Sequence, residues 1–240
     1  MYYRYETHCH GSQCSACARS TTQELVRAYH AAGFSGMVLT DHFIHGNTAV
    51  DRRLPWEEQM RCFYQAYLDA KQVGDELDFD VIFGIEDGIG RGKEVLIYGI
   101  DLPFLLANPD MPTLPLEELT ERVHAYGGIV IQAHPYRDRP YVDMSVEPRA
   151  DVVDGFEIRN VWNKPGEDKK ALRLARTGNY LMTCGGDIHV AGDSKLGTTG
   201  IALPYRIRNE KELVQALKSG DCRYIIGEKI VSEITEEDLP

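Results

Sequence analysis

The chain has 240 residues, of which 43% are hydrophobic and 26% are charged, and its formal net charge is −11. This composition is typical of a single globular domain, and the acidic balance disfavours binding of extended nucleic acid, which requires a basic surface. Polar residues follow Met1 and no apolar run is long enough to cross a bilayer. We therefore expect no secretory signal, no membrane partner and a cytoplasmic protein whose six cysteines are reduced.

Strand-like and helix-like segments alternate along the chain. A strand over residues 3–8 precedes a helix that opens with a capping box at Thr21 and ends at Gly33. A strand over 37–41 precedes a long helix over 56–74. Further strands are expected at 80–85, 94–99, 129–133, 153–158, 180–184 and 223–226, and further helices at 115–126, 166–177 and 209–219.

This alternation predicts an α/β fold in which a mainly parallel sheet is covered by helices, as one domain over residues 1–240. The four prolines between Pro103 and Pro115 indicate a surface connection. The segment 90–93 is expected to form a tight loop before a strand, and the acidic segment 233–240 to be a solvated end.

Six apolar runs end in side chains that bind metals. They end in His8 and His10, Asp41 and His42, Glu86, His134, Glu157, and Cys184 with Asp187 and His189. Because the strands of an α/β barrel present their last residues at one rim, we expect these side chains to converge on one site. Mixed nitrogen and oxygen ligands suit zinc, manganese or iron rather than calcium, and they also suit two ions bridged by a carboxylate.

The same motifs resemble the PHP (polymerase and histidinol phosphatase) family. Its five signatures occur in family order as His8-x-His10, Thr40-Asp41-His42, Gly84-x-Glu86, Ala133-His134-Pro135 and Gly185-x-Asp187-x-His189. The resemblance covers most of the chain. It implies a distorted (β/α)7 TIM-like barrel and metal-dependent hydrolysis of phosphoesters.

The resemblance also implies how the ligands are shared among one to three divalent ions. The ligands of one ion would be His8, His10, Glu86 and Asp187. Glu86 would bridge to a second ion that His134 also binds. His42 and His189 would serve the remaining site.

Two ligands of a three-metal site are missing from the sequence. Family members usually carry another His shortly after the His-x-His pair, where residues 11–17 contain none, and one in the strand that here reads Glu94-Val95-Leu96-Ile97. The residues that could fill a gap are Cys14, Cys17, Glu157 and His45. Otherwise the protein works with fewer ions, and we favour one or two tight ions with a weak third. Cys14 and Cys17 are interpreted mainly as loop thiols without function, since no second cysteine pair has zinc-site spacing.

Residues near the strand ends are also candidates for binding the substrate. Arg137 and Arg159 follow two of the ligand motifs, and a guanidinium binds phosphate oxygens through two hydrogen bonds. Arg137 is the stronger candidate. His45 lies in the expected mouth loop, where it either contacts substrate or is an ordinary loop residue.

These patterns predict a metal-dependent phosphoesterase that hydrolyses small phosphomonoesters, or nucleotide ends, by metal-bound hydroxide. His42 or His189 would protonate the leaving alkoxide, and Asp41 would orient a ligand histidine. The alternatives are a metal-dependent amidohydrolase and a non-catalytic module that binds metal or a phosphorylated ligand. The sequence predicts no oligomeric state.

Overall fold

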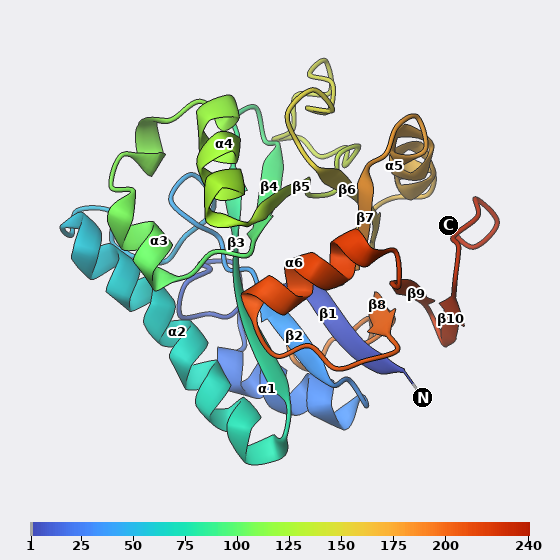
Figure 1. Cartoon of the computed structure of the whole chain (residues 1–240), viewed down its shortest axis with the longest axis horizontal. Coiled ribbons are helices and arrows are strands. Elements are labelled where there is room, and N and C mark those ends of the chain that lie inside the picture. The colour runs from blue at the N-terminus through green and yellow to red at the C-terminus, as the bar shows by residue number, and fades with distance from the viewer. Residues whose placement is uncertain (1) are drawn as a thin grey trace.

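The computed structural model describes residues 2–240, and in this range it contains one curved sheet flanked by helices (Figure 1). Ten strands follow one another across the sheet in the order β10-β9-β8-β1-β2-β3-β4-β5-β6-β7. Their bounds are β1 Tyr3–Cys9, β2 Gly36–Leu39, β3 Asp80–Gly88, β4 Glu94–Tyr98, β5 Ile129–Gln132, β6 Gly155–Asn160, β7 Leu181–Gly185, β8 Thr199–Leu203, β9 Arg223–Ile226 and β10 Lys229–Val231. The helices are α1 Thr22–Ala31, α2 Trp56–Leu77, α3 Leu102–Ala107, α4 Leu116–Tyr126, α5 Glu167–Ala175 and α6 Glu210–Ser219, with a 3-10 helix η1 at Met111–Thr113.

The sheet is mixed rather than mainly parallel. β1, β2 and β3 pair in parallel, as do β5, β6 and β7. β4 is antiparallel to both of its neighbours, because a tight turn, in which Ile89 N donates to Lys93 O (2.8 Å), joins it to β3 without a helix. β8, β9 and β10 are antiparallel to their neighbours as well. The predicted α/β class and the tight loop at 90–93 are confirmed, whereas the strand directions do not form seven regular βα units.

The chain after β7 lies against the end of β1. Asp187 N donates to His8 O (2.6 Å), and His10 N donates to Ile188 O (2.9 Å). Cys9 and Ile188 form a parallel bridge, so this segment continues the sheet beyond β1. The curvature therefore brings the ends of β1, β2, β3 and β7 to one rim, although these segments are far apart in sequence.

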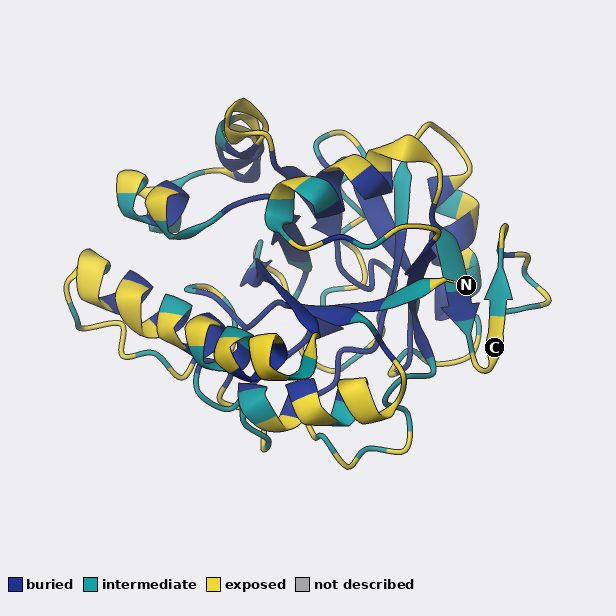
Figure 2. Cartoon of the chain, turned by 60° about the horizontal axis from the view of Figure 1, so that its bottom comes forward, coloured by how far each residue is buried: buried dark blue, intermediate teal, exposed yellow. Residues whose placement is uncertain are grey.

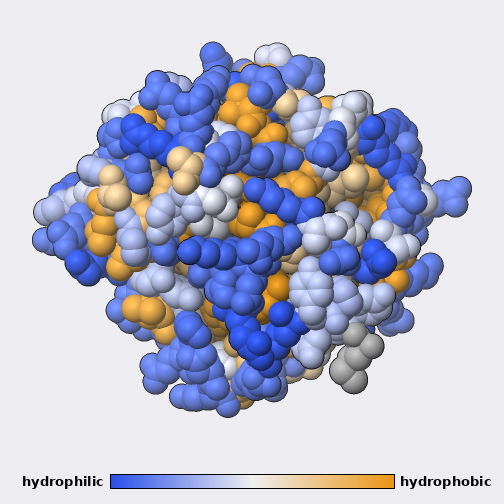
Figure 3. Space-filling model, in the orientation of Figure 1, coloured by the Kyte–Doolittle hydropathy of each residue, from blue (hydrophilic) through white to orange (hydrophobic). Residues whose placement is uncertain are grey.

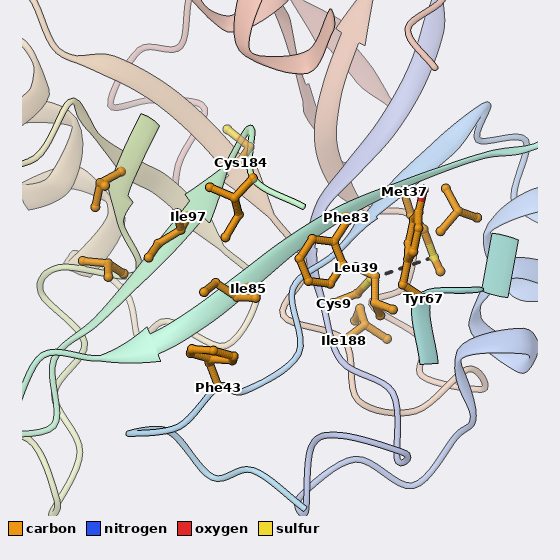
Figure 4. Packing of buried hydrophobic residues seen from close by; sticks show 14 of the residues in the cluster. Cys9, Met37, Leu39, Phe43, Tyr67, Phe83, Ile85, Ile97, Cys184 and Ile188 are labelled. Carbon is orange, nitrogen blue, oxygen red and sulfur yellow. Dashed lines mark hydrogen bonds between the residues drawn. The ribbon is translucent and has the colours of Figure 1, made fainter. Parts of the chain in front are cut away.

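Apolar side chains pack on both faces of the curved sheet. Val38 and Ile82 belong to the cluster that contains the buried Leu213 of α6. Met37 and Phe83 belong to the cluster on the opposite face, which also holds buried residues of α1 and α2 (Figure 4). Strands covered on both sides carry continuous apolar runs, as residues 37–39 of β2 and 81–83 of β3 do. The helices that cover the sheet bury one side and expose the other (Figure 2).

The segment between Pro103 and Pro115 is more ordered than the predicted surface connection. The Asp101 side chain caps α3 by accepting from Phe104 N (3.1 Å), and Pro103 lies in the first turn, where a backbone N–H has no helical partner. η1 lies in the same stretch. The strand β8 was also not predicted, since its five residues form a strand by pairing with β1.

The C-terminal segment 233–240 packs onto the domain, so the prediction of a solvated end is wrong. Ile234 and Leu239 are buried, and Pro240 O accepts from Gly166 N (3.1 Å). The acidic side chains face outward, and Glu236 pairs with Arg173 on α5. Apolar packing, a backbone hydrogen bond and an ion pair together join this segment to its neighbours.

None of the helices in residues 2–240 is long and apolar enough to span a membrane. The longest, α2, has 22 residues and buries only one of its faces. On the side of the molecule seen in Figure 3, hydrophilic residues cover most of the surface and apolar residues form separate patches.

Candidate metal centre

The seven side chains predicted to bind metal lie together at the rim of the sheet. They are His8, His10, His42, Glu86, His134, Asp187 and His189. All except the half-buried His189 are buried. β1, β2, β3 and β5 place their carboxyl ends at this rim, and the segment after β7 adds the last two residues. The predicted convergence of the motifs is therefore seen in the structure.

The Glu86 carboxylate is the centre of the cluster. Its Oε1 lies 3.1 Å from His8 Nε2 and 3.2 Å from His134 Nε2. Its Oε2 lies 2.9 Å from His42 Nδ1 and 3.5 Å from His10 Nε2. One carboxylate facing four imidazoles from both of its oxygens has the arrangement needed to bridge two cations.

Asp187 completes the cluster from the opposite side. Its Oδ1 lies 3.2 Å from His10 Nε2, and its Oδ2 accepts from the Arg137 guanidinium at 2.8 Å. Asp187 and His134 have φ values of 50° and 28°, in the left-handed region that residues with a side chain rarely adopt. Such backbone strain concentrates at functional sites, where the surrounding structure enforces it.

Several polar atoms in this cluster have no hydrogen-bond partner among the residues described. They are His8 Nε2, His10 Nε2, His42 Nδ1, Glu86 Oε2 and Asp41 Oδ2. Buried polar atoms are normally paired, so donor atoms that face one another without hydrogen-bond geometry are arranged as cation ligands are. Four groups of three residues have ligand atoms close enough to share an ion. The residues present therefore fit divalent cations.

Glu157 lies behind the cluster and orients two of its histidines. Its Oε1 lies 2.8 Å from His8 Nδ1, and its Oε2 accepts from His134 N (3.0 Å) and from the amide of Asn160 (3.0 Å). These contacts use both carboxylate oxygens. Glu157 therefore positions ligands and does not fill one of the two gaps in the ligand set.

Glu6 has a similar supporting role that sequence reasoning missed. Its fully buried carboxylate accepts from His8 N (2.8 Å), Gly186 N (2.7 Å) and the Tyr29 hydroxyl (2.7 Å). These bonds tie β1 to the Gly186 turn before Asp187. Burial raises the pKa of Glu6 to about 7. A glutamate two residues before His8, in the same strand, was the available signal.

Asp41 acts through a serine rather than directly on an imidazole. Its Oδ1 accepts from Gly11 N (2.6 Å) and from Ser15 Oγ (2.7 Å). Ser15 Oγ in turn accepts from His42 N (3.0 Å). Asp41 therefore holds the loop 11–20 against His42. The structure gives it a positioning role, and Asp41 does not line the pocket that opens above the cluster.

Glu94 enters the cluster at a position that the sequence did not single out. Because β4 is antiparallel, its first residue lies at the rim where the parallel strands end. Glu94 Oε2 lies 3.5 Å from His134 Nε2, and Oε1 lies 3.9 Å from His42 Nδ1. Leu96 lies in the buried core instead. A carboxylate therefore occupies part of the space near which a further histidine was expected.

Cys17 also lies at the cluster, whereas Cys14 does not. Cys17 lines the pocket together with His42 and His189. The Cys14 thiol is buried and points to Phe63 O (3.6 Å), away from the rim. Because the loop 11–20 folds over the site, Cys17 and not Cys14 lies where it could fill a gap in the ligand set.

A pocket of about 500 Å³ opens above the cluster. Two of the three residues predicted to bind substrate line it, and the third does not. Arg137 lines this pocket beside Asp187. His45 also lines it, and its ring is held by Asp87 Oδ2 (2.9 Å) and Pro112 O (3.0 Å). Arg159 does not reach the pocket, because its guanidinium bonds Asp168 Oδ2 (2.6 Å) on α5. Its predicted contact with phosphate is not supported.

Solved structures of known proteins share this architecture. A two-domain protein from Bacteroides vulgatus that contains a predicted PHP-like metal-dependent phosphoesterase aligns with a TM-score of 0.67 and 14% identity, over 96% of this chain and 66% of that chain. The lesion-specific endonuclease PfuEndoQ from Pyrococcus furiosus gives 0.66 and 11%, over 93% and 58%. An amidohydrolase from Chromobacterium violaceum, with bound sulfate and no metal, gives 0.59 and 14%, over 89% and 96%.

The chain has a PHP-like fold. The predicted resemblance is thus confirmed for the fold, which is what similarity at this level of identity establishes. No model of a known protein family and no curated protein sequence matches the chain. The activity has to be argued from the residues that this PHP-like fold brings together.

Ionisation of the cluster depends on contacts among its own members. Burial alone would lower the pKa of His42, but Cys17 and Glu86 outweigh this effect and raise it to about 11. Burial and the charge of Glu86 raise the pKa of Glu94 to about 8. Burial would raise the pKa of Cys17, but His189 and His42 outweigh it and lower the pKa to about 6. In the metal-free protein, His42 and Glu94 therefore hold protons at neutral pH.

Metal affinity is expected to rise with pH. His42 and Glu94 must each lose a proton to bind a cation, so roughly two protons should leave per ion between about pH 6 and 8. Calorimetric titration of manganese or zinc in two buffers of different ionisation enthalpy would count these protons. An affinity that does not change across this pH range would contradict the expectation.

Proposed function

We propose that the protein is a metal-dependent phosphoesterase that hydrolyses small phosphomonoesters. The observation that carries this proposal is the Glu86-centred cluster, in which imidazoles and carboxylates face a pocket that also holds a buried arginine. Divalent ions bound there would neutralise phosphate oxygens and lower the pKa of water. The pocket volume of about 500 Å³ suits a small substrate.

The chain's own residues provide the other requirements of phosphoester hydrolysis. Arg137 carries its charge into the pocket, and contact with Asp187 outweighs burial and raises its pKa further. Its position favours binding of a phosphate oxygen next to the cluster. His189 Nδ1 donates to Asp187 O (2.9 Å), so the proton of the neutral ring lies on Nδ1 and Nε2 carries the lone pair. His189 Nε2 is therefore the atom that binds a cation or exchanges a proton.

Nucleotide ends are the second substrate class. The PHP-like fold occurs in a lesion-specific endonuclease, which supports phosphodiester substrates. The net charge of −11 disfavours a long duplex, because few cations are available to neutralise its phosphates. A short single-stranded end needs contact with only a few phosphates.

Release of phosphate from an aryl phosphate tests the proposal. The chain loaded with manganese or zinc is expected to turn over, and His10→Ala should abolish activity because His10 faces both Glu86 and Asp187. His30→Ala, which removes an exposed imidazole on α1, is the matched control and should be fully active. Bound metal without turnover of any phosphoester would overturn the proposal. Hydrolysis of amides alone would instead favour the amidohydrolase alternative.

Substitution of Arg137 tests phosphate binding separately from metal binding. Arg137→Lys keeps a positive charge but loses the paired donors, so the inhibition constant for inorganic phosphate should rise about 30- to 100-fold, as loss of one or two charged hydrogen bonds predicts. The metal content should stay unchanged. Arg27→Ala, an exposed position on α1, is the control. Unchanged inhibition by phosphate would remove Arg137 from the proposed site.

A further inference from the structure

The loop 11–20 is fixed between two elements of the metal cluster. Ala16 N donates to Asn47 O (2.9 Å), and Ser15 forms a bridge with Thr48, so one side of the loop pairs with the segment after His42. On the other side, Arg19 N donates to His189 O (2.9 Å). These backbone bonds flank residue 17 on both sides. The position of Cys17 is therefore set by the fold and not by a free surface loop.

The thiol of Cys17 lies beside two imidazoles at the pocket wall. Cys17, His42 and His189 all line the same pocket above the cluster. His10 adjoins the same pair, with ring centroids 4.3 Å from His42 and 4.4 Å from His189. His10 is fully buried, and its Nε2 has no hydrogen-bond partner among the residues described. His10, His42 and His189 also have ligand atoms close enough together to hold an ion.

We infer that Cys17 supplies a thiolate ligand to the cation held by His42 and His189. This inference rests on the proposed metal-dependent function, and it assigns the ligand of one ion. The site would then combine one sulfur with imidazole nitrogen, whereas the Glu86 side of the cluster, with Glu94 and His134, offers oxygen and nitrogen only. Thiolate and imidazole together select zinc over manganese, so the two sides of one cluster prefer different metals.

The other cysteines near the cluster do not compete for this role. Cys9 lies between His8 and His10 in sequence but turns to the opposite face of the sheet, where its sulfur lies 3.9 Å from Met37 Sδ (Figure 4). Cys14 is buried and points away from the rim. Cys62 is exposed on α2 and serves as an internal reference.

Alkylation of the thiols tests the inference without any measurement of turnover. The whole chain, freed of metal, is treated with N-ethylmaleimide in the presence and absence of zinc, and the labelled peptides are quantified by mass spectrometry. Zinc should slow the labelling of Cys17 by about tenfold or more at concentrations well above its dissociation constant, since only the free thiolate reacts. Labelling of Cys62 should not change. Equal labelling rates for Cys17 with and without bound zinc would overturn the inference.

Cobalt substitution gives a second and direct measurement. A thiolate bound to Co²⁺ produces a sulfur-to-metal charge-transfer band in the near ultraviolet. The band should be present in the unmodified chain and in Cys62→Ser, and absent in Cys17→Ser and Cys17→His. Cys17→His should still bind the ion, because imidazole replaces the thiolate. Cobalt bound with no such band in the unmodified chain would contradict the inference.

These outcomes separate the inference from the proposed phosphoesterase activity. If the protein hydrolyses phosphoesters but zinc does not slow the alkylation of Cys17, the thiolate ligand is overturned and the activity stays in place. Zinc protection of Cys17 without turnover of any phosphoester supports the ligand and overturns the activity. A chain that binds no divalent cation contradicts both.

Discussion

Replacing Glu86 with glutamine is expected to abolish metal-dependent turnover and to release most of the bound metal. Both carboxylate oxygens of Glu86 face imidazoles, at 2.9 Å from His42 Nδ1 and 3.1 Å from His8 Nε2. An amide keeps the size of the side chain but loses the negative charge and one acceptor. Bound metal is expected to stabilise the transition state by several kcal/mol, and losing this stabilisation corresponds to a fall in kcat/KM of about 1000-fold.

The Glu86→Gln variant can be tested by elemental analysis together with steady-state kinetics. Glu76→Gln makes the same chemical change at an exposed position of α2 and should leave both metal content and kcat/KM unchanged. A Glu86→Gln chain that retains full metal and full activity would show that Glu86 does not bind the catalytic ions. The proposed arrangement of the cluster would then be wrong.

Adding one methyl group at Gly185 is expected to disrupt the site and to lower stability. A Cβ at this position would lie 2.4 Å from Glu157 Oε1 and 2.4 Å from His8 Cβ, distances at which one of these side chains must move. Overpacking of this kind costs about 1–3 kcal/mol of folding free energy. Displacing Glu157 from His8 should also weaken metal binding by roughly 10- to 100-fold, the usual effect of losing an orienting partner.

Gly192→Ala is the matched control for Gly185→Ala. Nothing lies within 4 Å of a Cβ built at Gly192, so the same substitution has space there. Thermal unfolding of the metal-free chains would report the packing cost, and metal titration would report the displacement of His8. Equal melting temperatures and equal metal affinities for Gly185→Ala and the unmodified protein would contradict the close contact seen at this glycine.

The sequence motifs predicted that these side chains lie together, because each motif stands at or near the end of a strand. In a curved sheet, strands that run in the same direction end at the same rim. The meeting of His8, Glu86 and His134 can therefore be predicted before their contacts are known. The same reasoning failed for Glu94. It begins its strand, and only the antiparallel direction of β4 places that end at the rim.

The two arginines show a similar limit. Arg137 and Arg159 both follow ligand motifs, and the sequence favoured Arg137 without showing which side chain either of them contacts. The structure places Arg137 against Asp187 (2.8 Å) and Arg159 against Asp168 (2.6 Å). The direction that an arginine side chain takes after a strand end depends on which acidic side chain is near it in space. In sequence, that partner is 50 residues from Arg137 and 9 residues from Arg159.

The sequence by itself determined the α/β class, the set of histidines and carboxylates, and their convergence, because each depends on short-range patterns that strand ends repeat. The tertiary structure alone decided which further side chains lie beside the cluster. Cys17 reaches the cluster through backbone bonds of its loop to Asn47 and His189, and Glu94 reaches it through the reversal of one strand. Such contacts join residues far apart in the chain, so no local pattern encodes them.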